Sequence, residues 1–123
     1  NSSIVNNQAI GASARGGGIS NAFGVAVVTI DQSSIVNNRA IGEDAVGGGI
    51  STMFGGNTTL TGTNVNANRA AGDVNGMGGG VYTNFGGSTT ADASSNIHGN
   101  KASTSHDDVF GSLTLLEDAL ALV

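Results

Sequence analysis

The chain repeats itself with a period of about 31 residues. The stretch 2–7, Ser-Ser-Ile-Val-Asn-Asn, returns letter for letter at 33–38, and three consecutive glycines occur at 16–18, 47–49 and 78–80. A period of this length is typical of solenoids and propellers, in which each unit is stable because a neighbour covers its open face. The sequence therefore predicts a stack of similar units, whose function lies in columns of side chains and at the two ends of the stack.

The length and composition predict one ordered domain over residues 1–123. Hydrophobic residues make up 38% of the 123 residues and charged residues 11%, which is the balance of a folded chain and not of a disordered one. The chain contains no cysteine, which removes disulfides and thiolate metal sites. We expect no cofactor.

The charge balance narrows the range of partners. Nine acidic residues stand against four basic ones, giving a formal net charge of −5. A nucleic-acid partner needs a basic face that neutralises phosphates, so we expect none. No apolar run approaches the ~20 residues of a membrane-spanning helix, so we expect no membrane span. The chain starts at Asn1 without a methionine, as a processed product would, which is consistent with secretion.

Each of the four repeats carries an apolar residue followed three positions later by an asparagine. The apolar residues are Ile4, Ile35, Val65 and Ile97, and the asparagines are Asn7, Asn38, Asn68 and Asn100. A side-chain amide both donates and accepts hydrogen bonds, so stacked asparagines can bond to one another from unit to unit. We predict an internal asparagine ladder; the alternative places each asparagine in an exposed turn.

Two further apolar columns follow the glycine triplets. The first consists of Ile19, Ile50 and Val81, and the second of Phe23, Phe54 and Phe85. We predict that both columns point inward and form the core, isoleucine on isoleucine and phenylalanine on phenylalanine.

The segments between these columns are short and rich in β-branched residues, as at 2–5, 25–30 and 58–61, which predicts strands. Several short strands per repeat fit a coil that stacks on the next by parallel pairing at ~4.8 Å. We predict an all-β parallel β-helix of four coils, at about 1–31, 32–62, 63–93 and 94–123.

The second and third repeats resemble a known family. The stretch 47–61 reads Gly-Gly-Gly-Ile-Ser-Thr-Met-Phe-Gly-Gly-Asn-Thr-Thr-Leu-Thr, and 64–70 reads Asn-Val-Asn-Ala-Asn-Arg-Ala. These repeats resemble those of secreted right-handed parallel β-helix proteins, including polymorphic outer-membrane and autotransporter-like surface proteins, and the pectate-lyase-like superfamily at the level of the fold. The resemblance implies a right-handed coil and an extracellular or cell-surface location. It is less specific for activity, because this scaffold carries adhesins, structural fibres and enzymes.

Three of the four basic residues occupy one repeat position. Arg39, Arg69 and Lys101 each follow a ladder asparagine directly. Stacked like charges repel unless countercharges lie near. Acidic residues of the following loops would make this column a compensated, solvated edge, and the alternative is a linear site for an anionic polysaccharide.

The fourth repeat departs from the pattern. His106, Asp107 and Asp108 stand in the region where a glycine triplet is expected, and we interpret them as a terminal turn, with a metal or catalytic site as the weaker alternative. The segment 113–123 is the most apolar of the chain, and it predicts either a terminal cap or a strand that another molecule receives. The residues of such a subunit contact are Leu113, Leu115, Leu116, Leu120, Leu122 and Val123.

The sequence favours a protein without catalytic activity. A polysaccharide lyase or hydrolase needs clustered carboxylates and a base, whereas the acids here are scattered among loops. An ice-binding face needs Thr-x-Thr rows in register, and aligning Thr59-Leu60-Thr61 with 28–30 and 90–92 gives none. We expect a secreted structural or surface protein whose coils stack within a longer β-helix or head to tail into a filament. The main alternative is a carbohydrate-binding adhesin.

Overall fold

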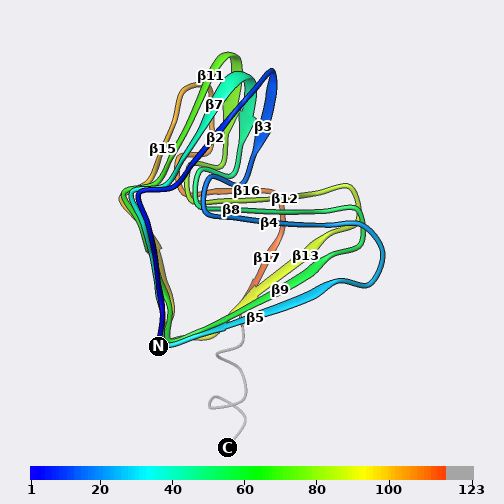
Figure 1. Ribbon diagram of the computed structural model, residues 1–123. Coiled ribbons are helices and arrows are strands. Elements are labelled where there is room, and N and C mark those ends of the chain that lie inside the picture. Colours follow the sequence, from blue (N-terminus) through cyan, green and yellow to red (C-terminus); the bar gives the residue numbers. More distant parts are fainter. Residues whose placement is uncertain (116–123) are drawn as a thin grey trace, which may run out of the picture.

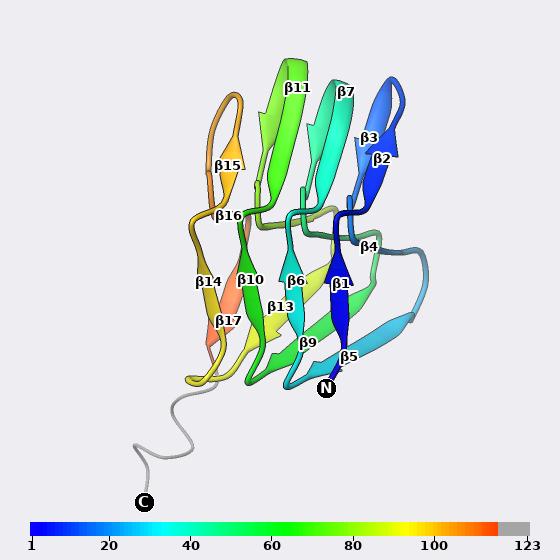
Figure 2. The ribbon, with the colours of Figure 1, turned by 60° about the vertical axis from the view of Figure 1, so that its left-hand side comes forward.

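The computed structural model describes residues 1–115, which form a parallel β-solenoid without helices (Figure 1). The chain winds around one axis and adds strands to four sheets in every turn (Figure 2). Three complete turns separate the first strand of the first sheet from its last, and a fourth turn follows. The first sheet contains β1 (Ser3–Val5), β6 (Ser34–Val36), β10 (Asn64–Asn66) and β14 (Asn96–His98).

The other three sheets follow in the same order along each turn. The second sheet contains β2 (Gln8–Ile10), β3 (Ser13–Arg15), β7 (Arg39–Val46), β11 (Arg69–Met77) and β15 (Lys101–Ala102). The third contains β4 (Ile19–Ala22), β8 (Ile50–Met53), β12 (Val81–Asn84) and β16 (Val109–Phe110). The fourth contains β5 (Val27–Asp31), β9 (Asn57–Thr61), β13 (Ser88–Ala91) and β17 (Leu113–Leu115). All pairs are parallel, which confirms the predicted fold class.

The core consists of inward-facing columns, one from each of three sheets. In the first sheet Ile35 pairs in register with Ile4 and Val65, and Val65 pairs with Ile97. In the third sheet Ile50 pairs with Ile19 and Val81. These columns pack against Ile30, Leu60 and Ala91 of the fourth sheet. Since successive strand residues alternate between the two faces, an in-register repeat keeps identical side chains inside, and these two predicted apolar columns are confirmed.

The phenylalanine column lies outside the core, so its predicted inward orientation was wrong. The side chains of Phe23 and Phe85 are 70% and 57% exposed, and the ring of Phe54 stacks between theirs at centroid distances of 5.0 and 5.2 Å. Alternate residues of a strand face the same side, so Phe54 would face inward with Ile50 if the strand continued to residue 54. Strand β8 instead ends at Met53, and Phe54 takes a left-handed φ of 53° that turns its ring out.

The second sheet extends from the coil as an arm, seen at the top of Figure 1. This arm consists of an outgoing and a returning leg in each turn, at residues 8–15, 39–46, 69–77 and 101–105. In the first turn these legs are β2 and β3, and both pair with β7 of the next turn. Buried alanines fill the space between the legs, and the small side chain lets the legs lie close. These alanines are Ala14, Ala40, Ala45, Ala70 and Ala102.

The glycine triplets lie where the arm rejoins the coil. The first glycine of each triplet has a left-handed backbone, as Gly47 does with a φ of 64°. The second glycine lies against the next turn. A Cβ on Gly48 would strike the carbonyl oxygen of Gly79 and the backbone of Arg69. The triplets therefore allow the turns to approach closely.

Candidate functional site at the two ends of the solenoid

The asparagine column is an internal hydrogen-bonded ladder that points in one direction. Both the backbone N–H and the side-chain Nδ2 of Asn38 donate to Oδ1 of Asn68, at 2.9 and 3.0 Å. Asn7 donates to Asn38 and Asn68 donates to Asn100 in the same way. Asn38, Asn68 and Asn100 are buried, which confirms the ladder and excludes the exposed-turn alternative for them. The residue before a ladder asparagine, such as Asn37, has the left-handed backbone of the turn.

A carboxylate ends this ladder at the fourth turn. The backbone N–H and Nδ2 of Asn100 both donate to Oδ1 of Asp108, each at 3.0 Å. The geometry is the same as between the asparagines of the preceding turns, with a carboxylate in place of the next asparagine. An ionised carboxylate only accepts hydrogen bonds, so it cannot pass the ladder on. Asp107 acts similarly, because its Oδ1 accepts the backbone N–H of Ala102 at 2.9 Å.

The segment His106-Asp107-Asp108 occupies the position of a glycine triplet. The carbonyls of Asp107 and Asp108 accept the N–H groups of Gly80 and Val81, as glycine carbonyls do one turn earlier. His106 has a left-handed φ of 60°, close to the 63° of Gly78. The predicted terminal turn is therefore present, but sequence reasoning missed what its carboxylates do. The signal was available: an asparagine ladder needs an acceptor beyond its last rung.

The contacts of His106, Asp107 and Asp108 do not support the alternative of a metal or catalytic site. Both carboxylates accept hydrogen bonds from the chain's own N–H groups. The Nδ1 of His106 lies 2.9 Å from Oγ of Ser105, and the ring packs edge to face on Phe110. Among residues 1–115, no three acidic or histidine side chains gather closely enough to hold a metal ion.

The first turn is open at the opposite end of the solenoid. A cavity of about 400 Å³ is lined by Ile4, Ile19, Val28 and Ile30, together with polar residues of the rim. Ile4 and Ile19 are half-buried, whereas their register partners one turn on, Ile35 and Ile50, are 0% exposed. Strands β1, β2, β4 and β5 lie at sheet edges. Within residues 1–115, this end therefore leaves apolar side chains and one edge of each sheet uncovered.

The predicted basic column exists as three exposed cations in register. Arg69 pairs with Arg39 on one side and with Lys101 on the other. Lys101 forms an ion pair with Asp107, with 3.7 Å between Nζ and Oδ2, and this is the only salt bridge of the described chain. The predicted compensation by loop carboxylates is thus found at one of the three positions.

Carboxylate hydrogen bonding also shapes the corner between the third and fourth turns. Oδ1 of Asp92 accepts the backbone N–H of Gly62 at 3.0 Å, and the hydroxyls of Ser94 and Ser95 donate to its two oxygens, each at 2.8 Å. These hydrogen bonds, that from Gly62 first, lower the pKa of Asp92 from 3.8 to about 2. The side chain therefore stays ionised in this corner at neutral pH.

The fourth sheet contains the threonines that were aligned from the sequence and part of the apolar C-terminal segment. Thr59 pairs with Thr29 and with Thr90, so the alignment with residues 28–30 was wrong by one position. The outer face carries a single threonine column, because Thr61 pairs with Asp31 and no Thr-x-Thr rows form. Leu113 and Leu115 belong to β17, which pairs with the chain's own β13. The contact residues Leu116, Leu120, Leu122 and Val123 lie outside the described residues.

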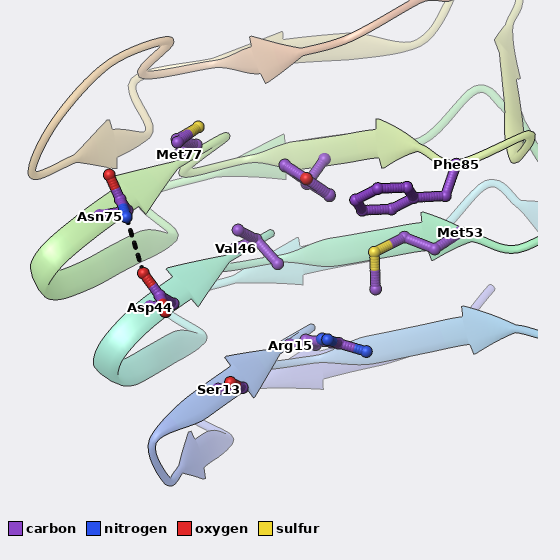
Figure 3. Close-up of a pocket in the computed structure, with 9 residues that line it drawn as sticks. Ser13, Arg15, Asp44, Val46, Met53, Asn75, Met77 and Phe85 are labelled. Atoms are coloured by element: carbon purple, nitrogen blue, oxygen red, sulfur yellow. Dashed lines mark hydrogen bonds between the residues drawn. The ribbon is translucent and has the colours of Figure 1, made fainter.

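A groove that the sequence did not predict lies between the returning legs of the arm and the outer face of the third sheet (Figure 3). Its volume is about 210 Å³, and Met53 and Tyr82 lie at its base. Asn75 Nδ2 donates to Oδ1 of Asp44 at 2.8 Å on the arm side, and Phe85 closes the other side. The groove depends on the arm, and nothing in the repeat pattern distinguished an arm from a flat strand.

Comparisons with protein-family models, curated proteins and solved structures found no match. The part of the chain that the structure describes contains no helix long and apolar enough to cross a membrane.

Proposed function

We propose that this protein is a secreted, non-catalytic structural or surface protein whose first turn is covered by another β-solenoid turn. The observation that carries the proposal is the open apolar face, where Ile4 and Ile19 are only half-buried although their counterparts Ile35 and Ile50 are completely buried. Parallel strand addition at this face would repeat the pairing already present between all neighbouring turns. The added turn belongs either to a longer β-helix or to a second copy stacked head to tail.

The regular columns support a structural role. The inward columns of the first and third sheets are filled by isoleucine or valine in every turn, so these positions are adapted to stacking. The extracellular or cell-surface location rests on the resemblance of the repeats to secreted β-helix proteins.

Adding one turn in front of the chain tests the proposal. We expect a copy of residues 32–61 fused before Asn1 to raise the thermal unfolding midpoint by about 5 °C or more, because it buries the apolar face of the first turn. Circular dichroism of the fused and parent proteins measures this shift. The matched control carries aspartate at the positions copied from Ile35 and Ile50. A control that stabilises as much as the apolar extension would contradict the proposal.

A second candidate function is binding of an anionic polysaccharide along the basic column. Arg39 and Arg69 are neighbouring exposed cations, and neither forms an ion pair with the described residues. Such a pair offers two adjacent sites for the carboxylates or sulfates of a chain laid along the solenoid axis.

Neutralising this pair gives a direct test. If the candidate is right, the double substitution Arg39→Gln/Arg69→Gln weakens binding of polygalacturonate about tenfold, since the two exposed charges together contribute up to ~2 kcal/mol. Calorimetric titration at low salt measures the affinity. Arg15→Gln is the control, because Arg15 lies in the groove and away from the column. Equal losses in the control and the double variant would argue for nonspecific attraction.

A further inference from the structure

The two ends of the solenoid are built differently, and the difference lies at one repeat position. At that position the first three turns have glycine triplets and the fourth turn has His106-Asp107-Asp108. We propose that Asp107 and Asp108 close the fourth turn against strand addition by a second copy of this chain. The inference rests on the proposed function, and it narrows it: the turn that covers the open first turn is not the fourth turn of another copy.

The first argument is steric. Val81 pairs with Val109, which places Asp107 and Asp108 at the positions of Gly79 and Gly80. At the same positions one turn earlier, a Cβ on Gly48 would meet the backbone of the following turn, and a Cβ on Gly49 would lie 2.7 Å from the carbonyl oxygen of Gly80. Side chains at these positions are therefore compatible only with a turn that has no neighbour on that side. The aspartates fill the space that the backbone of a fifth turn would need.

The second argument is hydrogen bonding. A stacked turn gains affinity by pairing with the free N–H groups of the turn below it. The two ladder donors of Asn100 and the N–H of Ala102 are already bonded to the aspartate oxygens. An incoming turn would have to displace charge-assisted hydrogen bonds, which are stronger than the neutral bonds it could offer.

The consequence concerns the predicted filament. Head-to-tail growth needs free donors and free space at the fourth turn, and the aspartates take both at the positions that would continue the ladder. Two copies can still associate face to face through the apolar side chains of their first turns, without strand pairing, but no third copy can follow. The unmodified protein is thus limited to one or two copies, whereas a protein with a restored triplet can grow.

Restoring the glycine triplet tests the inference. The triple variant His106→Gly/Asp107→Gly/Asp108→Gly and the parent are compared by sedimentation velocity over a hundredfold range of concentration. We expect the parent to form nothing larger than a pair and the variant to form assemblies that lengthen with concentration. The control Glu43→Gln/Asp73→Asn removes two exposed acidic charges elsewhere on the arm and should behave like the parent. Parent assemblies larger than a pair, or a folded triple variant that does not grow, would overturn the inference.

Hydrogen exchange keeps the test decisive if the triple variant does not fold. In the parent, the backbone amides of Asn100 and Ala102 should exchange within about tenfold of the rate of Asn68, because carboxylates protect them. Exchange of these two amides at the rate of unstructured chain would overturn the inference. Failure of the proposed function is seen separately, as an added first turn that does not stabilise the protein.

Discussion

Alanine in place of Gly48 is expected to destabilise the protein by more than about 4 kcal/mol, which would leave little of the folded state. The added methyl group would meet the carbonyl oxygen of Gly79 and the backbone of Arg69 in the next turn. These are main-chain atoms held by the sheets on both sides, so they cannot move away as a flexible side chain would. Urea unfolding followed by circular dichroism measures the loss.

Gly11→Ala is the matched control for this substitution. Gly11 lies at the tip of the arm in the first turn, where an added Cβ has no heavy atom within 4 Å. We expect its free energy of unfolding to stay within about 1 kcal/mol of the parent value. Similar losses at both glycines would show that glycine is needed for backbone freedom and not for the close approach of turns.

Removing the middle of the ladder is expected to have the next largest effect, about 3–5 kcal/mol for Asn68→Ala. The Oδ1 of Asn68 accepts two hydrogen bonds from Asn38, and its Nδ2 donates to Asn100 and to the carbonyl of Ile35. Alanine leaves these buried partners without a bond, and each buried unsatisfied group costs about 1–3 kcal/mol. The free energy of unfolding in urea measures the effect.

Asn7→Ala is the matched control, because it also removes a ladder asparagine but breaks few buried hydrogen bonds. Asn7 is exposed, and its side chain makes one hydrogen bond, to Oδ1 of Asn38. We expect Asn7→Ala to cost about 1 kcal/mol or less. A loss at Asn7 as large as that at Asn68 would argue that the ladder acts through local backbone conformation instead of through buried bonds.

The repeat predicted the solenoid well because register and core have the same cause. Once Ile35 lies on Ile4 and Val65, the parallel ladder fixes the neighbours of every residue in the strand. The asparagine ladder follows from the same logic, since an amide at a constant position must stack on its copies.

The errors arose where local geometry departs from the strand. Phe54 lies one residue beyond a strand end, and a left-handed φ there reverses the face that simple alternation predicts. The arm was not predicted because Arg39 to Val46 reads as one polar strand, and only the buried pair Ala40 and Ala45 shows that its two halves face each other. Such a fold-back depends on small residues, whose signal in a sequence is weak.

The single direction of the ladder makes it electrically polar. Every rung donates toward the fourth turn, so the aligned amide dipoles leave their positive end at Asn100, where the negative carboxylate of Asp108 lies as an acidic residue does at the start of a helix. The opposite end presents the carbonyl oxygen of the Asn7 side chain. A turn that covers the first turn must therefore bring paired N–H donors to this oxygen, as another asparagine would. This requirement selects both the sequence and the register of the partner.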